Sequence, residues 1–259
     1  MSALPMQPNL SRAVMFHPLF DHSVLLPTNA IEDVYRIVKR VVMLRETGCV
    51  FTGQSGVGKT DALARIRLML QADFPGLCTF THDAHNHEIA SIRAFFKHFL
   101  TTVGQNEKKG ETYDLRSRLI RLLVDESRIS GMNLIVMFID EANAMLLSDF
   151  LFLKDVYNDL SREGVQLITV LMGQDPDLKK VINDLRNEGR RDLIARFATR
   201  VYWIGGFAGT GDLQVVLREI DQREYPPKSG RTWTPVGQVK FPHLWPCQIP
   251  PGRTAPIVG

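Results

Sequence analysis

Short runs of hydrophobic residues alternate along the chain with segments whose hydrophobic residues recur every three or four positions. The runs begin near residues 49, 77, 134, 165 and 200, and their length is typical of buried β-strands. The segments between them have the period of amphipathic helices, as at 61–70, 89–100 and 176–187. Strands that alternate with helices are joined by right-handed crossovers, so the pattern predicts an α/β fold with a doubly wound, five-stranded parallel sheet and helices on both faces.

The strand at 134–139 is the clearest of the five. Six hydrophobic residues in a row, "LIVMFI", are followed by Asp140 and Glu141, and a run without alternation indicates a strand buried on both faces. We expect one helix over 29–45, before the first strand, and a long helix over 142–162, after the acidic pair. In the helix at 61–70, the residues expected to face the core are Leu63, Ile66, Leu68 and Leu70.

The composition changes near both ends of the chain. Prolines at 5, 8, 18 and 27 are typical of an extended arm. Eight of the fourteen prolines fall in 225–259, and no Asp or Glu follows Glu224, so this stretch is too proline-rich for the core. Its aromatic residues either fold back on the domain or bind a partner. We expect an arm at 1–30, a folded domain at 31–224 and a tail at 225–259 that is a candidate partner-binding segment.

The overall composition limits the class of protein. The chain has 259 residues, 44% of them hydrophobic and 23% charged, and a formal net charge of +3, so any case for nucleic-acid binding must rest on local patches. No hydrophobic run approaches the roughly 20 residues that span a bilayer, and the first residues lack a signal-peptide pattern. We expect a cytoplasmic protein with no membrane partner. The three cysteines lack metal-type spacing and fit reduced thiols.

The segment "GQSGVGKT" follows the first strand and precedes a helix, and it has the pattern of a phosphate-binding loop. In such a loop, glycines permit positive φ while successive N–H groups and the positive end of the next helix bind phosphate oxygens. Lys59 would reach the β and γ phosphates. A glycine turn with an incidental lysine is the alternative, and the flanking strand and helix argue against it. The expected nucleotide-binding residues are Gly53, Gln54, Ser55, Gly56, Val57, Gly58, Lys59, Thr60 and Asp61.

Asp140 and Glu141 suggest divided roles in hydrolysis. Asp140 and Thr60 would be metal ligands for Mg²⁺, and Glu141 would deprotonate the water that attacks the γ-phosphate. The alternative is that two acids merely end a strand, but this would leave uncompensated charge beside the loop, where a metal ion would offset it. Gln174, after the strand at 165–172, either senses the γ-phosphate or belongs to an ordinary turn. ATP and Mg²⁺ are the expected cofactors, with Lys59, Glu141 and Gln174 as catalytic residues.

The segment "NEGRRDLIARFATR" offers arginines that a subunit could supply to its neighbour's site, where a guanidinium stabilises the charge on a transferred phosphoryl group. The order "GQSGVGKT", "FIDEAN", "LMGQD" and "LIARF" resembles that of the AAA+ ATPases over roughly residues 30–207. The resemblance implies a P-loop AAA+ fold and maps the catalytic arginine onto Arg196, with Arg191 and Arg200 as lesser candidates. Past Gly206 only "GDLQVVLREID" is helix-like, which implies a minimal or absent lid.

More narrowly, the short chain, the segment "PTNAIEDVYRIV" and the near-absent lid resemble the transposition regulators TnsC, TniB and MuB. This resemblance implies an ATPase that forms rings or helical filaments on double-stranded DNA, links a target-selection protein to a DDE-type transposase, and disassembles on hydrolysis. A helicase loader or replication initiator is the alternative within the class, and a nucleotide-gated scaffold with little turnover is the non-enzyme alternative. A small-molecule kinase stays open from the loop alone, whereas a missing Asn-Lys-x-Asp motif disfavours a GTPase.

Basic residues between the second strand and the acidic strand are the candidates for DNA contact. They lie on two expected helices and in the polar loop at 104–111. The alternative is an ordinary solvated face paired with nearby acids. With the family resemblance, sequence-independent phosphate contacts are expected. The residues expected to make them are Lys97, Lys108, Lys109 and Arg118.

Overall fold

A computed structural model of the chain describes residues 27–85, 91–206, 209–222 and 224. The chain divides into two compact units, Asn29–Ala208 and a second made of Met1–Thr28 and Gly209–Gly259. The first unit holds the sheet, and the second includes helix α9 (Thr210–Gln222). The arm predicted at 1–30 lies mostly outside the described residues and the tail at 225–259 entirely so, so the division into arm, domain and tail stays a prediction.

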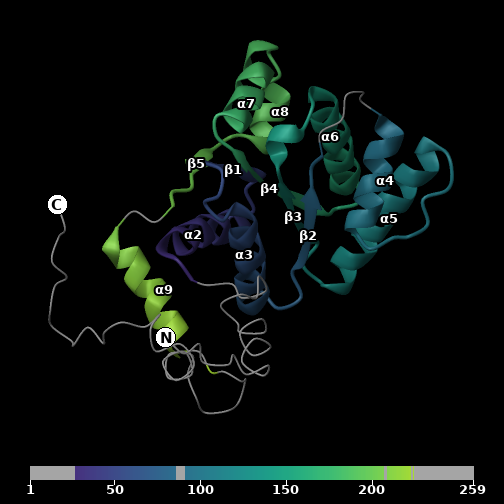
Figure 1. Ribbon diagram of the computed structural model, residues 1–259. Helices are drawn as coiled ribbons and strands as arrows, with labels where there is room; N and C mark the ends of the chain where they lie inside the picture. The colour runs from purple at the N-terminus through teal and green to yellow at the C-terminus, as the bar shows by residue number, and fades with distance from the viewer. Residues whose placement is uncertain (1–26, 86–90, 207–208, 223, 225–259) are drawn as a thin grey trace, which may run out of the picture. The chain divides into compact units, whose positions relative to one another are not determined.

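Five parallel strands form one sheet in the order β2-β3-β4-β1-β5 (Figure 1). The chain leaves β1 for the far edge at β2, returns through β3 to β4 beside β1, and then passes β1 to reach β5 on its other side, which is a doubly wound path. Every residue of β1 and β3 is buried, as expected of central strands in a parallel sheet. The strands are β1 (Gly48–Gly53), β2 (Cys78–Asp83), β3 (Leu134–Asp140), β4 (Gln166–Gln174) and β5 (Val201–Trp203).

Helices cover both faces of the sheet, and alternate residues of each strand supply the two cores. On β3, Met137 and Ile139 pack with one group of helices, whereas Val136 and Phe138 pack with the other. The first group is α4 (Ile92–Thr102), α5 (Thr112–Ile129), α6 (Leu147–Arg162), α7 (Asp177–Asn187) and α8 (Arg191–Phe197). The second group is α2 (Asn29–Met43) and α3 (Lys59–Asp73). The α/β fold predicted from the hydrophobic pattern is confirmed.

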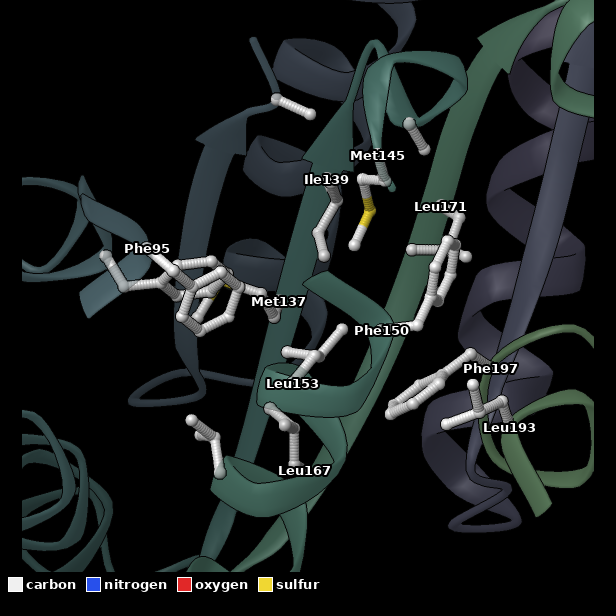
Figure 2. Packing of buried hydrophobic residues seen from close by; sticks show 14 of the residues in the cluster. Phe95, Met137, Ile139, Met145, Phe150, Leu153, Leu167, Leu171, Leu193 and Phe197 are labelled. Atoms are coloured by element: carbon white, nitrogen blue, oxygen red, sulfur yellow. The ribbon is translucent and has the colours of Figure 1, made fainter. Parts of the chain in front are cut away.

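Helix α6 is the centre of the larger core. Figure 2 shows Phe150 and Leu153 on α6 reaching toward β3 and β4, with Leu171 beside Phe150. Phe197 of α8 extends the same cluster, with its ring centroid 6.2 Å from that of Phe150. Because α6 follows the acidic end of β3, its packing also fixes the direction in which the chain leaves that end.

The structure corrects the long helix predicted over 142–162. Glu141 has a left-handed conformation with φ of 50°, a short 3₁₀ helix follows at η2 (Ala142–Ala144), and α6 begins only at Leu147. The physical reason is an N-terminal cap, because the Asp149 carboxylate accepts a hydrogen bond from the Leu146 amide at 2.8 Å. Helix α8 is an element that the hydrophobic pattern did not predict. None of the helices among the described residues is both long enough and apolar enough to cross a membrane.

Two leucines on helices provide a matched test of this core. Leu153 is fully buried, whereas Leu68, which the periodicity assigned to the core, is 53% exposed. We expect Leu153→Ala to lower the free energy of unfolding by about 2–5 kcal/mol, since it leaves a cavity. Leu68→Ala should change it by less than about 0.5 kcal/mol. Urea unfolding followed by circular dichroism measures both values, and equal losses would contradict the packing of α6 on the sheet.

Candidate active site

The C-terminal ends of the strands bring most of the predicted site residues to one edge of the sheet. The loop that follows β1 lies beside the end of β4, because Gly53 is the register partner of Gln174. At the end of β3, Asp140 is the register partner of Asp83 on β2. In open α/β sheets, ligands bind outside this edge. The parallel strands therefore bring these residues together where a ligand would bind.

The glycines of the loop at 53–60 are required for two different reasons. Gly56 and Gly58 have φ values of 77° and 80°, and a Cβ atom at either position would meet no heavy atom within 4 Å. Their constraint is therefore the left-handed backbone, and the space beside them is open. Gly53 is constrained by packing, because a Cβ atom there would lie 2.7 Å from the carbonyl oxygen of Ile204. Two of the loop glycines are thus required by backbone conformation and one by packing.

Helix α3 begins directly from this loop. Its first residue is Lys59, and the Ala62 amide donates to the Gly58 carbonyl at 2.9 Å. The amides of the first turn, up to Asp61, precede the repeating hydrogen bonds of the helix and are available to an anion. Because the positive end of the helix dipole lies at the same place, the backbone here is suited to bind a phosphate group.

Lys59 lies within the loop. The side chain is only 7% exposed, and its Nζ donates to the carbonyl oxygens of Gln54 at 2.9 Å and Gly53 at 3.4 Å. These partners are neutral, and among the described residues no acidic side chain pairs with the buried ammonium, so its charge is uncompensated there. A phosphate would be a stronger partner for it than a carbonyl oxygen.

Thr60 and Asp140 meet across the site. The Thr60 hydroxyl donates to Asp140 Oδ2 at 2.7 Å, and the Glu141 amide donates to Asp140 Oδ1 at 2.9 Å. Asp140 is only 3% exposed, and no ion pair reaches its carboxylate from any part of the chain that the structure describes. A hydroxyl and a carboxylate are oxygen ligands of the kind that Mg²⁺ prefers. The residues present therefore fit this ion, and the unpaired buried charge gives a physical reason for binding it.

Glu141 is exposed and is held by a residue that the sequence reasoning left unassigned. Asn143 Nδ2 donates to Glu141 Oε2 at 3.3 Å, while Asn143 Oδ1 accepts from the Gln174 amide at 2.8 Å. Gly173 makes room for this side chain, because a Cβ atom there would lie 2.6 Å from Asn143 Oδ1. The only signal in the sequence was an amide two residues after the acidic pair. Predicting its partners required the fold of the 142–146 turn.

Asp175 is a second residue that the sequence reasoning missed. Its amide donates to the Gly53 carbonyl at 2.9 Å, and its carboxylate accepts from the Thr52 hydroxyl at 3.3 Å. Lys179 pairs with the same carboxylate at 2.7 Å. These contacts connect the turn after β4 to the end of β1, so they fix the position at which the loop at 53–60 begins.

The structure does not bring Arg196 to the loop of its own chain. The carbonyl of its neighbour Ala195 accepts from the hydroxyl of Thr47, at 3.2 Å, just before β1 begins. Because the loop follows the other end of this strand, six residues or roughly 20 Å lie between them. The Arg196 guanidinium stacks on the Tyr157 ring, 5.5 Å from its centroid. A role for Arg196 in the site of another copy stays a prediction.

The other arginines of this segment differ in their pairing. Arg200 makes two contacts with the Glu46 carboxylate, at 3.1 and 3.2 Å. Arg190 donates to Asp192, and this hydrogen bond, together with one from Lys154, holds the pKa of the Asp192 carboxyl well below its usual range. Arg191 is exposed at the start of α8. The Lys154–Asp192 pair joins α8 to α6, whereas the Arg200–Glu46 pair lies outside α8.

The four residues predicted to contact DNA divide into two kinds. Arg118 Nη1 donates to the carbonyls of Glu107, at 2.8 Å, and Lys109, at 3.2 Å, so it braces the connection between α4 and α5. Lys97 is half-buried on α4, and Lys108 and Lys109 lie in that connection. Within residues 91–206, no acidic side chain forms an ion pair with any of the three lysines, and the alternative of an ordinary solvated face stays open. Contact with DNA itself stays a prediction.

The fold is similar to those of two proteins of known structure. Against the Orc1 protein of Aeropyrum pernix, solved in complex with DNA, the TM-score is 0.51 at 14% identity, over 80% of this chain and 52% of that one. Against Cdc6p of Pyrobaculum aerophilum it is 0.52 at 14% identity, over 72% of this chain and 48% of that one. The chain thus spans about half the length of these proteins, and at this identity the similarity shows the fold alone.

The sequence carries a family match of its own. No curated protein matches the chain at a significant level. A family profile described as an AAA domain matches residues 44–182, which is more than half of the chain and includes the loop, Asp140, Glu141 and Gln174. The chain therefore belongs to the AAA domain family.

Proposed function

We propose that the chain is a magnesium-dependent ATPase that acts on DNA. The observation that carries the proposal is the convergence, at one sheet edge, of an open glycine loop, the buried Lys59 ammonium and the buried Asp140 carboxylate. Cationic and anionic groups that keep uncompensated charge in one site suit a ligand that is itself a polyanion with a bound cation. Nucleoside triphosphate with magnesium has this chemistry.

Each residue has a role that follows from its place. The loop amides and Lys59 would bind the phosphates, and Thr60 and Asp140 would hold Mg²⁺, which supplies charge stabilisation when bound. Glu141, exposed at the mouth of the site, would accept a proton from the attacking water. Gln174, on the neighbouring strand end, would sense the γ-phosphate. Arg196 would act in the site of a second copy, which implies an oligomer.

We favour a replication-initiator or helicase-loader type of activity within this class. The fold similarity to Orc1 and Cdc6p supports it, and the Orc1 structure contains DNA. On this chain the residues proposed to contact DNA phosphates are Lys97, Lys108 and Lys109, since Arg118 is engaged within the protein. A chain of this kind should need a helicase for its action and should prefer single strands.

Regulation of transposition is the second candidate. Helix α2 forms over the segment "NAIEDVYRIV" that carried the resemblance to TnsC, TniB and MuB, and this observation keeps the hypothesis open. Such a regulator should form ATP-dependent filaments on any duplex, without a helicase, and should bind a transposase and a target-selection protein. A scaffold with little turnover should change its oligomeric state without DNA. Electron microscopy with ATP, Mg²⁺ and a random duplex separates the three.

Removing Lys59 tests nucleotide binding. We expect Lys59→Ala to weaken ATP binding at least about tenfold, because a charge-assisted hydrogen bond is worth about 1.5–3 kcal/mol. Isothermal calorimetry with ATP and Mg²⁺ measures the affinity, and circular dichroism checks the fold. Lys180→Ala, which replaces an exposed lysine of α7, is the matched control and should bind normally. If Lys59→Ala and Lys180→Ala bound ATP with equal affinity, the loop would not be part of the nucleotide site.

Replacing Glu141 tests hydrolysis separately from binding. Glu141→Gln should bind ATP like the wild type and hydrolyse it about 10²–10⁴-fold more slowly, because the amide cannot accept the proton. Phosphate release and ATP affinity measure the two effects. The variant should also remain on duplex DNA in ATP, and its prompt release would argue against hydrolysis-driven disassembly. Glu163→Gln, a surface acid that pairs with Arg128, is the control.

Replacing Lys108 and Lys109 tests the DNA contact. The double alanine variant should weaken binding to every duplex sequence alike, and it should reduce the slope of log affinity against log salt by about 2, one for each phosphate contact. Fluorescence anisotropy with a random duplex, measured at salt concentrations from about 50 to 200 mM, gives the slope. Lys180→Ala, which removes an exposed lysine on α7, is the control. An unchanged slope would place the DNA contact elsewhere.

A further inference from the structure

We propose that Asn143 is a positioning residue that holds the Glu141 carboxylate and connects it to the end of β4. Both amide atoms of Asn143 are engaged, Nδ2 with Glu141 Oε2 at 3.3 Å and Oδ1 with the Gln174 amide at 2.8 Å. The inference rests on the proposed function, since the place of the Glu141 carboxylate matters only if it acts on the attacking water.

The partners themselves fix the orientation of the Asn143 amide. The Gln174 backbone N–H can only donate, and an ionised carboxylate can only accept. Turning the amide over would set Nδ2 against the N–H and Oδ1 against the carboxylate, and both contacts would become repulsive. The side chain is therefore locked at the β4 end, and it presents its NH₂ group to Glu141 in one direction.

The backbone is built to place Asn143 there. Glu141 adopts a left-handed φ of 50°, which turns the chain at the end of β3, and η2 brings Asn143 back toward β4. Gly173 supplies the space, because a Cβ atom there would lie 2.6 Å from Asn143 Oδ1 and 2.9 Å from Leu178. The left-handed Glu141, the short 3₁₀ helix and Gly173 thus all help to place the Asn143 side chain between Glu141 and the Gln174 amide.

This arrangement has a consequence for the site. Glu141 is exposed, and an exposed glutamate samples several rotamers, so its carboxylate needs an anchor to stay in one place. The anchor ends on the backbone of Gln174, the residue proposed to sense the γ-phosphate. A displacement of that strand end would therefore move the amide that holds Glu141. Misplacement of a reacting group by about 1 Å can cost about 10²-fold in rate.

Two substitutions separate the two contacts. Asn143→Asp is isosteric and keeps an acceptor for the Gln174 amide, but it faces Glu141 with a second carboxylate. Asn143→Ala removes both contacts. The structural measurement is hydrogen exchange of the Gln174 amide in the full chain without nucleotide: the alanine variant should lose its protection, and the aspartate variant should keep it. Asn183→Asp, on the exposed face of α7, adds the same charge away from the site and is the control.

The kinetic measurement uses the full chain with ATP and Mg²⁺. We expect Asn143→Asp and Asn143→Ala to lower kcat about 10- to 100-fold with KM and ATP affinity unchanged. The same substitutions in the Glu141→Gln background should lower the residual rate by less than about twofold, because the group they position is already disabled. Should Asn143→Ala fail to fold, the isosteric aspartate decides the question.

The outcomes are distinguishable. If the wild type releases no phosphate from ATP, the proposed function fails and this inference fails with it. If the wild type is active and Asn143→Asp keeps the wild-type kcat, only the inference is overturned. An equal loss of rate in the wild-type and Glu141→Gln backgrounds also overturns it, because Asn143 would then act independently of Glu141.

Discussion

A buried carboxylate at the end of a central strand is the constraint on which the site depends. Asp140 ends β3, is only 3% exposed, and has the Thr60 hydroxyl and the Glu141 amide as its hydrogen-bond donors. Burying a carboxylate without a cation is costly, and here the position is set by a strand that is buried on both faces. The sheet therefore carries the charge to its edge, and α3 supplies the hydroxyl that meets it. The loop at 53–60, the end of β3 and the start of α3 therefore form one site.

Much of this arrangement could be predicted from the sequence, because the signals are local. Uninterrupted hydrophobic runs indicate strands whose ends share an edge, and the spacing of Gly53, Gly58 and Lys59 indicates the loop. The contacts of Asn143 could not be predicted in this way, since its partner Gln174 lies 31 residues further along the chain. The start of α6 was missed because a cap at Leu146 overrides the helical period. Leu68 is exposed because it lies two residues, or about 200° of helix rotation, from both Ile66 and Leu70, which face the core.

The basic residues show a further limit of sequence reasoning. Spacing alone treats Arg118, Lys108 and Lys109 as equivalent positive charges. In the structure the planar guanidinium of Arg118 bridges two backbone carbonyls, while Arg93 donates to the Gly110 carbonyl at 2.9 Å. Arginine is suited to such bridging and lysine is less so. The two arginines thus hold the connection between α4 and α5 in shape. Lys108 and Lys109 of this connection are the residues whose positive charge stays available to a DNA phosphate.

The pairing of charges distinguishes the site from its surroundings. Around α8, charges are neutralised within the protein: Asp192 pairs with Arg190 and Lys154. At the sheet edge, Lys59 and Asp140 both keep neutral hydrogen-bond partners, and no ion pair joins them among the residues that the structure describes. If Lys59 and Asp140 formed an ion pair with each other, that pair would have to break before a polyanion and its cation could bind. The pair would then stabilise the protein without its ligand. Loop carbonyls and a hydroxyl keep the two charges apart, so the fold leaves both available to a ligand of mixed charge.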